Sequence, residues 1–117
     1  MPERMRFHDD AMQQKLVAAT AALGIEHWVE DGYLCIHERD DEVVSCLREA
    51  VRCTIFPVWH QWRGGAAKDP SLYERYRKYM ADHCIRYVEE EEYGGRWFLL
   101  SKCDDPYTWG VEQFVRP

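Results

Sequence analysis

The stretch that decides the fold occurs twice in this chain. In the first half it reads Leu23-Gly24-Ile25-Glu26-His27-Trp28-Val29-Glu30, and in the second half it reads His83-Cys84-Ile85-Arg86-Tyr87-Val88-Glu89-Glu90. Each copy leads from a helical pattern into a run rich in β-branched and aromatic residues, which is typical of a strand. The match predicts an internally duplicated chain in which a helix, a β-hairpin and a second helix occur twice.

The helix that leads into the first copy is predicted over about residues 11–23. Asp10 is a suitable N-cap, and Gln13 three residues later completes a capping-box pattern. Apolar residues recur at helical spacing along this segment. Gly24 fits the left-handed position just after the helix, so the helix is expected to end there.

Beyond Gly24, the sequence predicts a β-hairpin of residues 25–30 and 33–38. Asp31-Gly32 is a dipeptide favoured by the two-residue type I′ turn, which needs positive φ at both positions. This turn places Val29 opposite Leu34 and His27 opposite Ile36. Because side chains alternate along a strand, these four residues share a core face, and Trp28 and Tyr33 lie on the other face. A second helix is expected from Asp40 or Asp41 to before Pro57.

The second copy repeats this order with its own signals. Asp69-Pro70 and Asp105-Pro106 each place a capping residue before a proline at a first helical position. Between these two helices lies a predicted hairpin of residues 85–91 and 96–102, whose loop has two or four residues. Either loop puts Tyr87 and Phe98 on the core face and Trp97 on the other. The longer loop places Cys84 opposite Cys103, where two reduced thiols are expected.

The predicted fold is α+β and forms one domain over residues 1–117. Two units, about 9–56 and 69–115, are joined by an aromatic connector, 57–68. The two hairpins are expected side by side in a four-stranded antiparallel sheet with helices packed on it, as in a ferredoxin-like or related two- or three-layer sandwich. Such a sheet is under about 20 Å wide and takes two helices on one face. Either the four helices divide between both faces, or another chain covers the face that bears Trp28, Tyr33 and Trp97.

Composition narrows the class of protein. Of the 117 residues, 46% are hydrophobic and 14% aromatic, which is typical of a globular domain. The formal net charge is −6, and neither half is basic, which argues against nucleic-acid binding. The chain has no apolar run of the roughly 20 residues that span a bilayer, and residues 1–10 do not resemble a secretory signal. Five cysteines without zinc-type spacing predict neither a disulfide scaffold nor a metal site. A cytoplasmic protein without a cofactor is therefore expected.

The connector is the longest stretch without helix or strand periodicity. Within it, Trp59, His60, Trp62 and Arg63 combine an aromatic wall with a titratable group and an anion-binding group. The simpler interpretation, which we prefer, is that the two tryptophans fill the core between the two units. Both interpretations remain open from the sequence.

The run of four glutamates, residues 89–92, alternates across the two faces of its strand. This alternation argues against a compact carboxylate site for a metal ion, because the ligands of such a site converge on one point. We expect a solvated hairpin tip, with Glu90 and Glu92 as a docking rim for a basic partner as the alternative.

The sequence contains no established catalytic motif: GxSxG, HExxH, a P-loop and GxGxxG are all missing. His27, His60, His83 and Tyr87 are candidates for an acid–base cluster, although hydrogen-bonded core positions are the preferred interpretation.

Two hypotheses follow from these observations. The first is a small acidic, non-catalytic protein-binding or regulatory module, of the immunity, antitoxin or phage-encoded inhibitor type, that binds a protein partner or forms a homodimer. The second is a small-molecule sensor or enzyme with a cleft under the Trp59–Arg63 segment. The first is preferred, and its candidate binding residues are Trp28, Tyr33, Trp97, Trp59, His60, Trp62, Arg63, Glu90 and Glu92.

Overall fold

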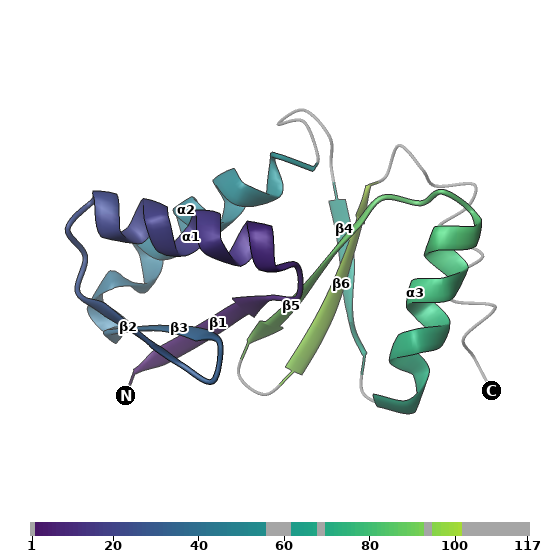
Figure 1. Cartoon of the computed structure of the whole chain (residues 1–117), viewed down its shortest axis with the longest axis horizontal. Coiled ribbons are helices and arrows are strands. Elements are labelled where there is room, and N and C mark those ends of the chain that lie inside the picture. The colour runs from purple at the N-terminus through teal and green to yellow at the C-terminus, as the bar shows by residue number, and fades with distance from the viewer. Residues whose placement is uncertain (1, 56–61, 68–69, 93–94, 102–117) are drawn as a thin grey trace.

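A computed structural model describes residues 2–55, 62–67, 70–92 and 95–101, which form three α-helices and a six-stranded antiparallel sheet. The strands are ordered β2-β3-β1-β5-β6-β4 across the sheet (Figure 1). In chain order the elements are β1 (Glu3–Phe7), α1 (Asp10–Ala22), β2 (His27–Glu30), β3 (Tyr33–Ile36), the 3-10 turn η1 (Glu38–Asp40), α2 (Asp41–Arg52), β4 (Trp62–Ala67), the 3-10 turn η2 (Pro70–Leu72), α3 (Tyr73–Asp82), β5 (Tyr87–Glu92) and β6 (Gly95–Ser101).

The α+β class and the antiparallel sheet are confirmed, but the two hairpins do not lie side by side. Strand β1, which we did not predict, lies between them and pairs with β3 through Met5 opposite Leu34 and with β5 through Phe7 opposite Glu90. Strand β4 is formed by part of the predicted connector and pairs with β6. The four-stranded sheet predicted from the hairpins is therefore wrong.

Within the hairpins, the local predictions hold. Asp31 and Gly32 both have positive φ, 51° and 82°, as a type I′ turn requires. Val29 pairs with Leu34 and His27 with Ile36, as predicted. In the second hairpin Glu91 pairs with Arg96, which is the register predicted for the longer loop, but Glu92 also pairs with Gly95, so the four-residue loop itself is wrong. Cys84 is exposed, and Cys103 lies outside the described residues.

Because β1 lies between the two hairpins, the two faces that the sequence placed on one side of the sheet lie on opposite sides. Partners in a ladder share a face, so the pairs through β1 place Leu34, Phe7 and Trp97 on one side, which we call the Leu34 face. Tyr33 and Phe98 lie on the opposite side, which we call the Phe98 face. Trp97 therefore does not share a face with Trp28 and Tyr33, which corrects the prediction.

The helices divide between these two faces, which was one of the two predicted arrangements. Helices α1 and α2 cover the Leu34 face at the β1–β3 end, and α3 lies at the other end of the molecule (Figure 1). The core under α1 and α2 consists of Met5, Phe7, Met12, Leu16, Leu34, Ile36, Val44, Val51 and Val88. The core under α3, on the Phe98 face, consists of Met80, Ile85, Phe98 and Leu100, with tyrosines packed around it.

Helix α1 is capped one residue earlier than we expected. The side chain of Asp9, not Asp10, accepts a hydrogen bond from the backbone N–H of Met12 at 3.0 Å. Gln13 does not form a capping box. Its Oε1 accepts from the N–H of Phe7 at 2.8 Å, and its Nε2 donates to the carbonyl of Gly32 at 3.2 Å. Gln13 therefore ties α1 to β1 and to the hairpin turn.

The two matching junctions, residues 23–30 and 83–90, have similar backbone geometry at the helix end. Gly24 and Cys84 both follow a helix with left-handed φ, 69° and 54°. After each, an isoleucine N–H donates back to the last helical turn, Ile25 to Thr20 at 3.3 Å and Ile85 to Met80 at 2.8 Å. The match extends to the helix end and the hairpin that follows. The predicted last helix lies outside the described residues, and the duplication as a whole stays a prediction.

Candidate functional site

The β2, β3 and β1 strands present part of the Phe98 face on which none of the described helices packs. We call this surface the open face, and it consists of Arg4, Arg6, Trp28, Glu30, Tyr33 and His37 around the buried Cys35. It arises because α1 and α2 lie on the opposite side and α3 is confined to the β5–β6 end. Trp28 and Tyr33, two of the candidate binding residues, are partly exposed here.

The aromatic side chains of the open face are held in place by their neighbours. The guanidinium of Arg4 lies 4.7 Å from the centroid of the Tyr33 ring, and that of Arg6 lies 5.9 Å from it. Both distances are within the range of cation–π attraction. Trp28 meets the ring of His37 edge-on, with centroids 5.3 Å apart. Both aromatic side chains of the open face thus contact a neighbouring side chain of the same chain.

Cys35 forms the floor of the open face. It is 3% exposed, and burial, reinforced by the carboxylate of Glu30, raises the pKa of its thiol. A raised pKa keeps the sulfur protonated near neutral pH, and the thiolate is the reactive form. Cys35 is thus a buried packing residue of this surface.

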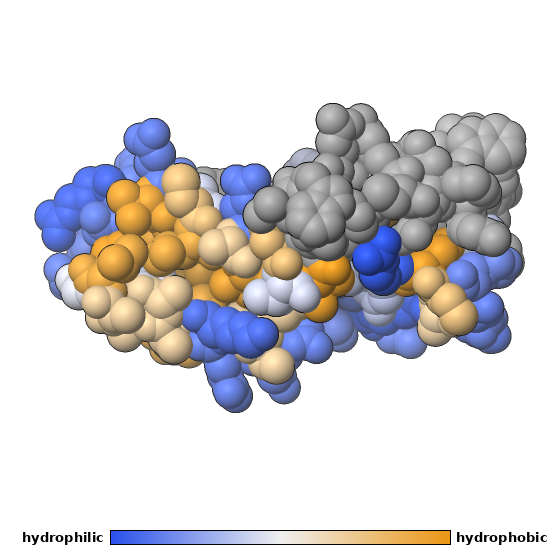
Figure 2. All heavy atoms as spheres, turned by 90° about the horizontal axis from the view of Figure 1, so that it is seen from above, coloured by the Kyte–Doolittle hydropathy of each residue, from blue (hydrophilic) through white to orange (hydrophobic). Residues whose placement is uncertain are grey.

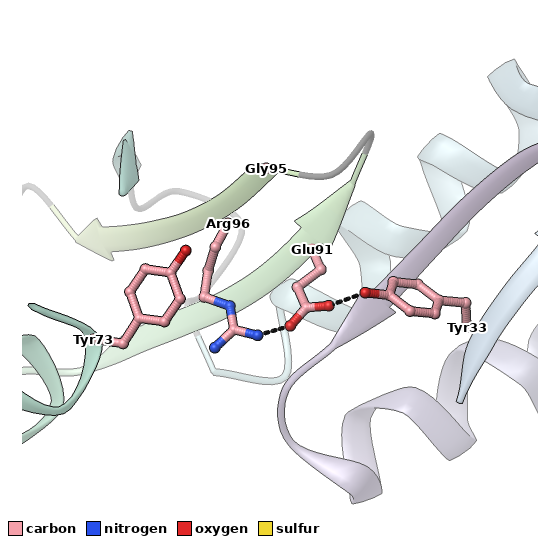
Figure 3. Close-up of a pocket in the computed structure, with 5 residues that line it drawn as sticks. All are labelled: Tyr33, Tyr73, Glu91, Gly95 and Arg96. Carbon is pink, nitrogen blue, oxygen red and sulfur yellow. Dashed lines mark hydrogen bonds and ion pairs between the residues drawn. The ribbon is translucent and has the colours of Figure 1, made fainter. Parts of the chain in front are cut away.

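A polar chain of side chains joins the open face to α3 (Figure 3). The hydroxyl of Tyr33 donates to the carboxylate of Glu91, which also pairs with Arg96. The guanidinium of Arg96 lies 4.5 Å from the ring centroid of Tyr73. With Gly95, these residues line a hollow of about 150 Å³. That volume is well below the roughly 300 Å³ at which pockets for small organic ligands begin.

The glutamate run is not the solvated tip that we predicted. Glu89 is 4% exposed and lies on the Phe98 face, where Arg77 of α3 donates to both of its carboxylate oxygens at 2.8 and 2.7 Å. Arg96 and His8 approach the same carboxylate at 3.0 and 3.6 Å. The hydrogen bond to Glu89 raises the pKa of Arg77, so this guanidinium stays charged.

Glu90 points to the opposite face and is also buried, at 3% exposed. Arg52 of α2 donates to its two oxygens at 2.5 and 2.7 Å, and the Nε of Arg48 lies 3.3 Å away. Successive residues of β5 thus anchor helices on both sides of the sheet. Since Glu90 is enclosed by its own chain, it does not form the docking rim that we expected.

The remaining candidate binding residues are not part of the open face as described. Trp97, 41% exposed, lies on the Leu34 face. The backbones of Trp62 and Arg63 belong to β4 and that of Glu92 to β5, and nothing is described of their side chains. Trp59 and His60 lie outside the described residues.

The proposed acid–base cluster does not form among the described residues. His27 lies on the Leu34 face, opposite Ile36, whereas Tyr87 lies on the Phe98 face, opposite Leu100. His83 is exposed and stacks on Tyr79 at 4.1 Å. The predicted convergence of His27 with Tyr87 is therefore wrong, because the two residues lie on opposite faces of the sheet.

Sequence reasoning missed Arg4 and Arg6 as residues of the open face, and Glu91 as the partner of Tyr33. The alternation of Arg4 and Arg6 with Met5 and Phe7 was the available signal, because it is the pattern of a half-buried strand.

Within the described ranges, no three His, Cys, Asp or Glu side chains are placed to hold a metal ion. None of the described helices is long and apolar enough to cross a bilayer. Comparison of the chain with protein-family models, with curated proteins and with solved structures found no match.

Proposed function

We propose that this protein is a non-catalytic binding module that recognises a partner protein through the open face. The observation that carries the proposal is the gathering of Trp28, Tyr33 and Arg4 on a part of the sheet over which none of the described helices packs. Tryptophan, tyrosine and arginine are the residue types that most often dominate binding energy at protein interfaces.

The order of these side chains supports the same proposal. Arg4 is already stacked on Tyr33, and Trp28 is already in contact with His37. Side chains that are ordered before association lose less conformational entropy when a partner binds. The open face is therefore better suited to recognition than the same residues would be on a loop.

The charges of the whole chain favour a basic partner. A formal net charge of −6 attracts positively charged proteins at a distance, which increases association rates. An inhibitor of the immunity or antitoxin type fits this proposal. The second hypothesis, a cleft under residues 59–63 of the connector, includes residues outside the described ranges and remains a prediction.

Site-specific photocrosslinking tests the proposal. Benzoylphenylalanine replaces Tyr33 on the open face in one variant and Val43, exposed on α2, in a matched control. In cells that produce the variant, we expect the Tyr33 variant alone to give a discrete crosslinked product with another protein. Adding Trp28→Ala is expected to abolish this product. Crosslinks of equal yield at both positions, or none at Tyr33, would contradict the proposal.

A further inference from the structure

Strand β2 is an outer edge of the described sheet and offers backbone groups for pairing. In a two-residue hairpin the residues that flank the turn, here Glu30 and Tyr33, form a hydrogen-bonded pair. Since hydrogen-bonded and non-bonded pairs alternate, the N–H and C=O groups of Val29 and His27 point away from β3. No described strand lies on that side.

A groove meets this edge at Val29, near the β2–β3 turn. It has a volume of about 420 Å³ and lies between α1 and the β2–β3 turn, with lining residues Arg6, Asp10, Gln13, Gln14, Val17, Ala18, Val29 and Gly32. Val29, which lines the groove opposite residues of α1, is 56% exposed. Figure 2 shows apolar side chains exposed over the end of the molecule that carries α1 and α2.

The other side of the same edge carries two exposed carboxylates. Glu30 projects from the Phe98 face of β2, and Glu26, which precedes the strand, pairs with His37 at 3.3 Å and with Arg39 at 3.6 Å. A strand added to β2 would thus meet apolar side chains on one face and carboxylates on the other. That pattern selects a segment in which apolar and basic residues alternate.

We propose that the β2 edge and the α1 groove together bind an extended segment of a partner protein with alternating apolar and basic side chains. This inference rests on the proposed protein-binding function and specifies the form of the partner. The backbone of the segment pairs with His27 and Val29, its apolar side chains enter the groove beside Val17, and its basic side chains approach Glu30. The volume of the groove holds more than one aliphatic side chain.

A second copy of this chain fits the edge less well. Pairing β2 with its own copy brings the glutamates of the two strands onto one face, and like charges across a strand pair are destabilising. Charge complementarity therefore favours a different protein with a basic segment.

The test uses a synthetic peptide, acetyl-Lys-Val-Lys-Val-Lys-Val-Lys-amide, and the isotope-labelled full chain. Amide exchange is followed by NMR at His27 and Val29. At saturation, we expect exchange of both amides to slow by about tenfold or more, because paired amides exchange only when the pair opens. The same peptide with N-methylated valines, which lack the donating N–H, and a Glu-Val version with reversed charge are expected not to protect them.

Two substitutions in the groove and one control outside it distinguish binding in the groove from nonspecific binding to exposed apolar residues. Val29→Lys is expected to weaken binding of the Lys-Val peptide by about tenfold, which corresponds to about 1.4 kcal/mol. Val17→Lys, on the α1 wall, is expected to do the same without altering the strand. Val43→Lys, at an apolar position with similar exposure outside the groove, is expected to leave binding unchanged.

Three outcomes would overturn the inference. Absence of peptide binding is one, and peptide binding that shifts Arg4 and Tyr33 but leaves the β2 amides unprotected is another. The third is a dimer, seen by light scattering, in which His27 and Val29 are protected without peptide, since a second copy then occupies the edge. Crosslinking through Tyr33 is scored separately, so the proposed function can survive each of these results.

Discussion

Replacing Glu90 by glutamine tests whether the glutamate run is part of the core or a solvated tip. Glu90 is 3% exposed, and its two carboxylate oxygens accept hydrogen bonds from Arg52 at 2.5 and 2.7 Å. Glutamine keeps the size of the side chain and removes its charge. It leaves the guanidinium groups of Arg48 and Arg52 under α2 without the carboxylate that they face.

The expected cost follows from the burial of the three groups. Removing one partner of a fully buried ion pair costs about 3–5 kcal/mol, because an uncompensated charge remains in the interior. The side chains of Arg48 and Arg52 are 12% and 17% exposed, so both can regain some water. We therefore expect Glu90→Gln to lower the free energy of unfolding by about 2–3 kcal/mol, somewhat below that range. A domain with the usual stability of about 5–15 kcal/mol still folds after such a loss.

Equilibrium unfolding in urea, followed by tryptophan fluorescence and circular dichroism, measures this difference. With a slope of about 1–2 kcal/mol per molar for a small domain, the midpoint should fall by about 1–3 M. Glu49→Gln makes the same charge change at an exposed position of α2 and should stay within about 0.5 kcal/mol of the parent.

Equal urea midpoints for Glu90→Gln and Glu49→Gln would refute the buried ion pair between Glu90 and Arg52. They would instead support the solvated hairpin tip predicted from the sequence. A double-mutant cycle with Arg52→Met adds a second criterion. A coupling energy below about 0.5 kcal/mol would show that Arg52 and Glu90 do not interact in solution, whatever each single change costs.

Three further predictions concern other parts of the fold. Iodoacetamide should label the exposed Cys46 and Cys84 quickly and Cys35 only at the rate of unfolding, because Cys35 is buried and its pKa is raised; equal labelling rates would contradict its burial. Cys84→Gly should raise the free energy of unfolding by about 1 kcal/mol and Gly24→Ala should lower it by a similar amount, since both positions have left-handed φ; changes of the opposite sign in thermal melts would contradict the helix ends described. Burial raises the pKa of Tyr87, so the folded state keeps this proton at a pH where the unfolded state loses it, and stability should fall as pH rises above about 10. Tyr87→Phe should make the fall shallower in unfolding curves measured across that range, and an unchanged slope would show that the phenol is not desolvated.

Local signals were sufficient for the parts of the fold that depend on a few adjacent residues. The dipeptide Asp31-Gly32 has the φ angles that the turn type needs, and this fixed the register of the first hairpin. Gly24 ends its helix for a similar reason, because an L-residue with a side chain disfavours positive φ. That register also placed Trp28 and Tyr33 together on the face opposite Leu34 and Ile36.

Sequence reasoning failed where the outcome depends on contacts between distant segments. The short run Glu3–Phe7 contains two arginines and was not predicted as a strand, although it forms a central one. Missing it placed Trp97 on the wrong side of the sheet. The partners of Glu89 and Glu90 are arginines on α3 and α2, and nothing near the glutamates in the sequence indicates them. A run of acidic residues is normally solvated, so the ordinary rule gave the wrong answer.

The central position of β1 also constrains the order in which the chain can fold. Met5 pairs with Leu34 on one side and with Glu92 on the other, so the strand closes both a short loop and one that spans most of the described chain. Long-range pairing of this kind raises the contact order and slows folding, because chain entropy is lost before the native contacts form. The β2–β3 hairpin can recruit β1 early and locally. The β5–β6 hairpin must then add to the exposed edge of β1, and until it does so that edge is available for pairing with other chains.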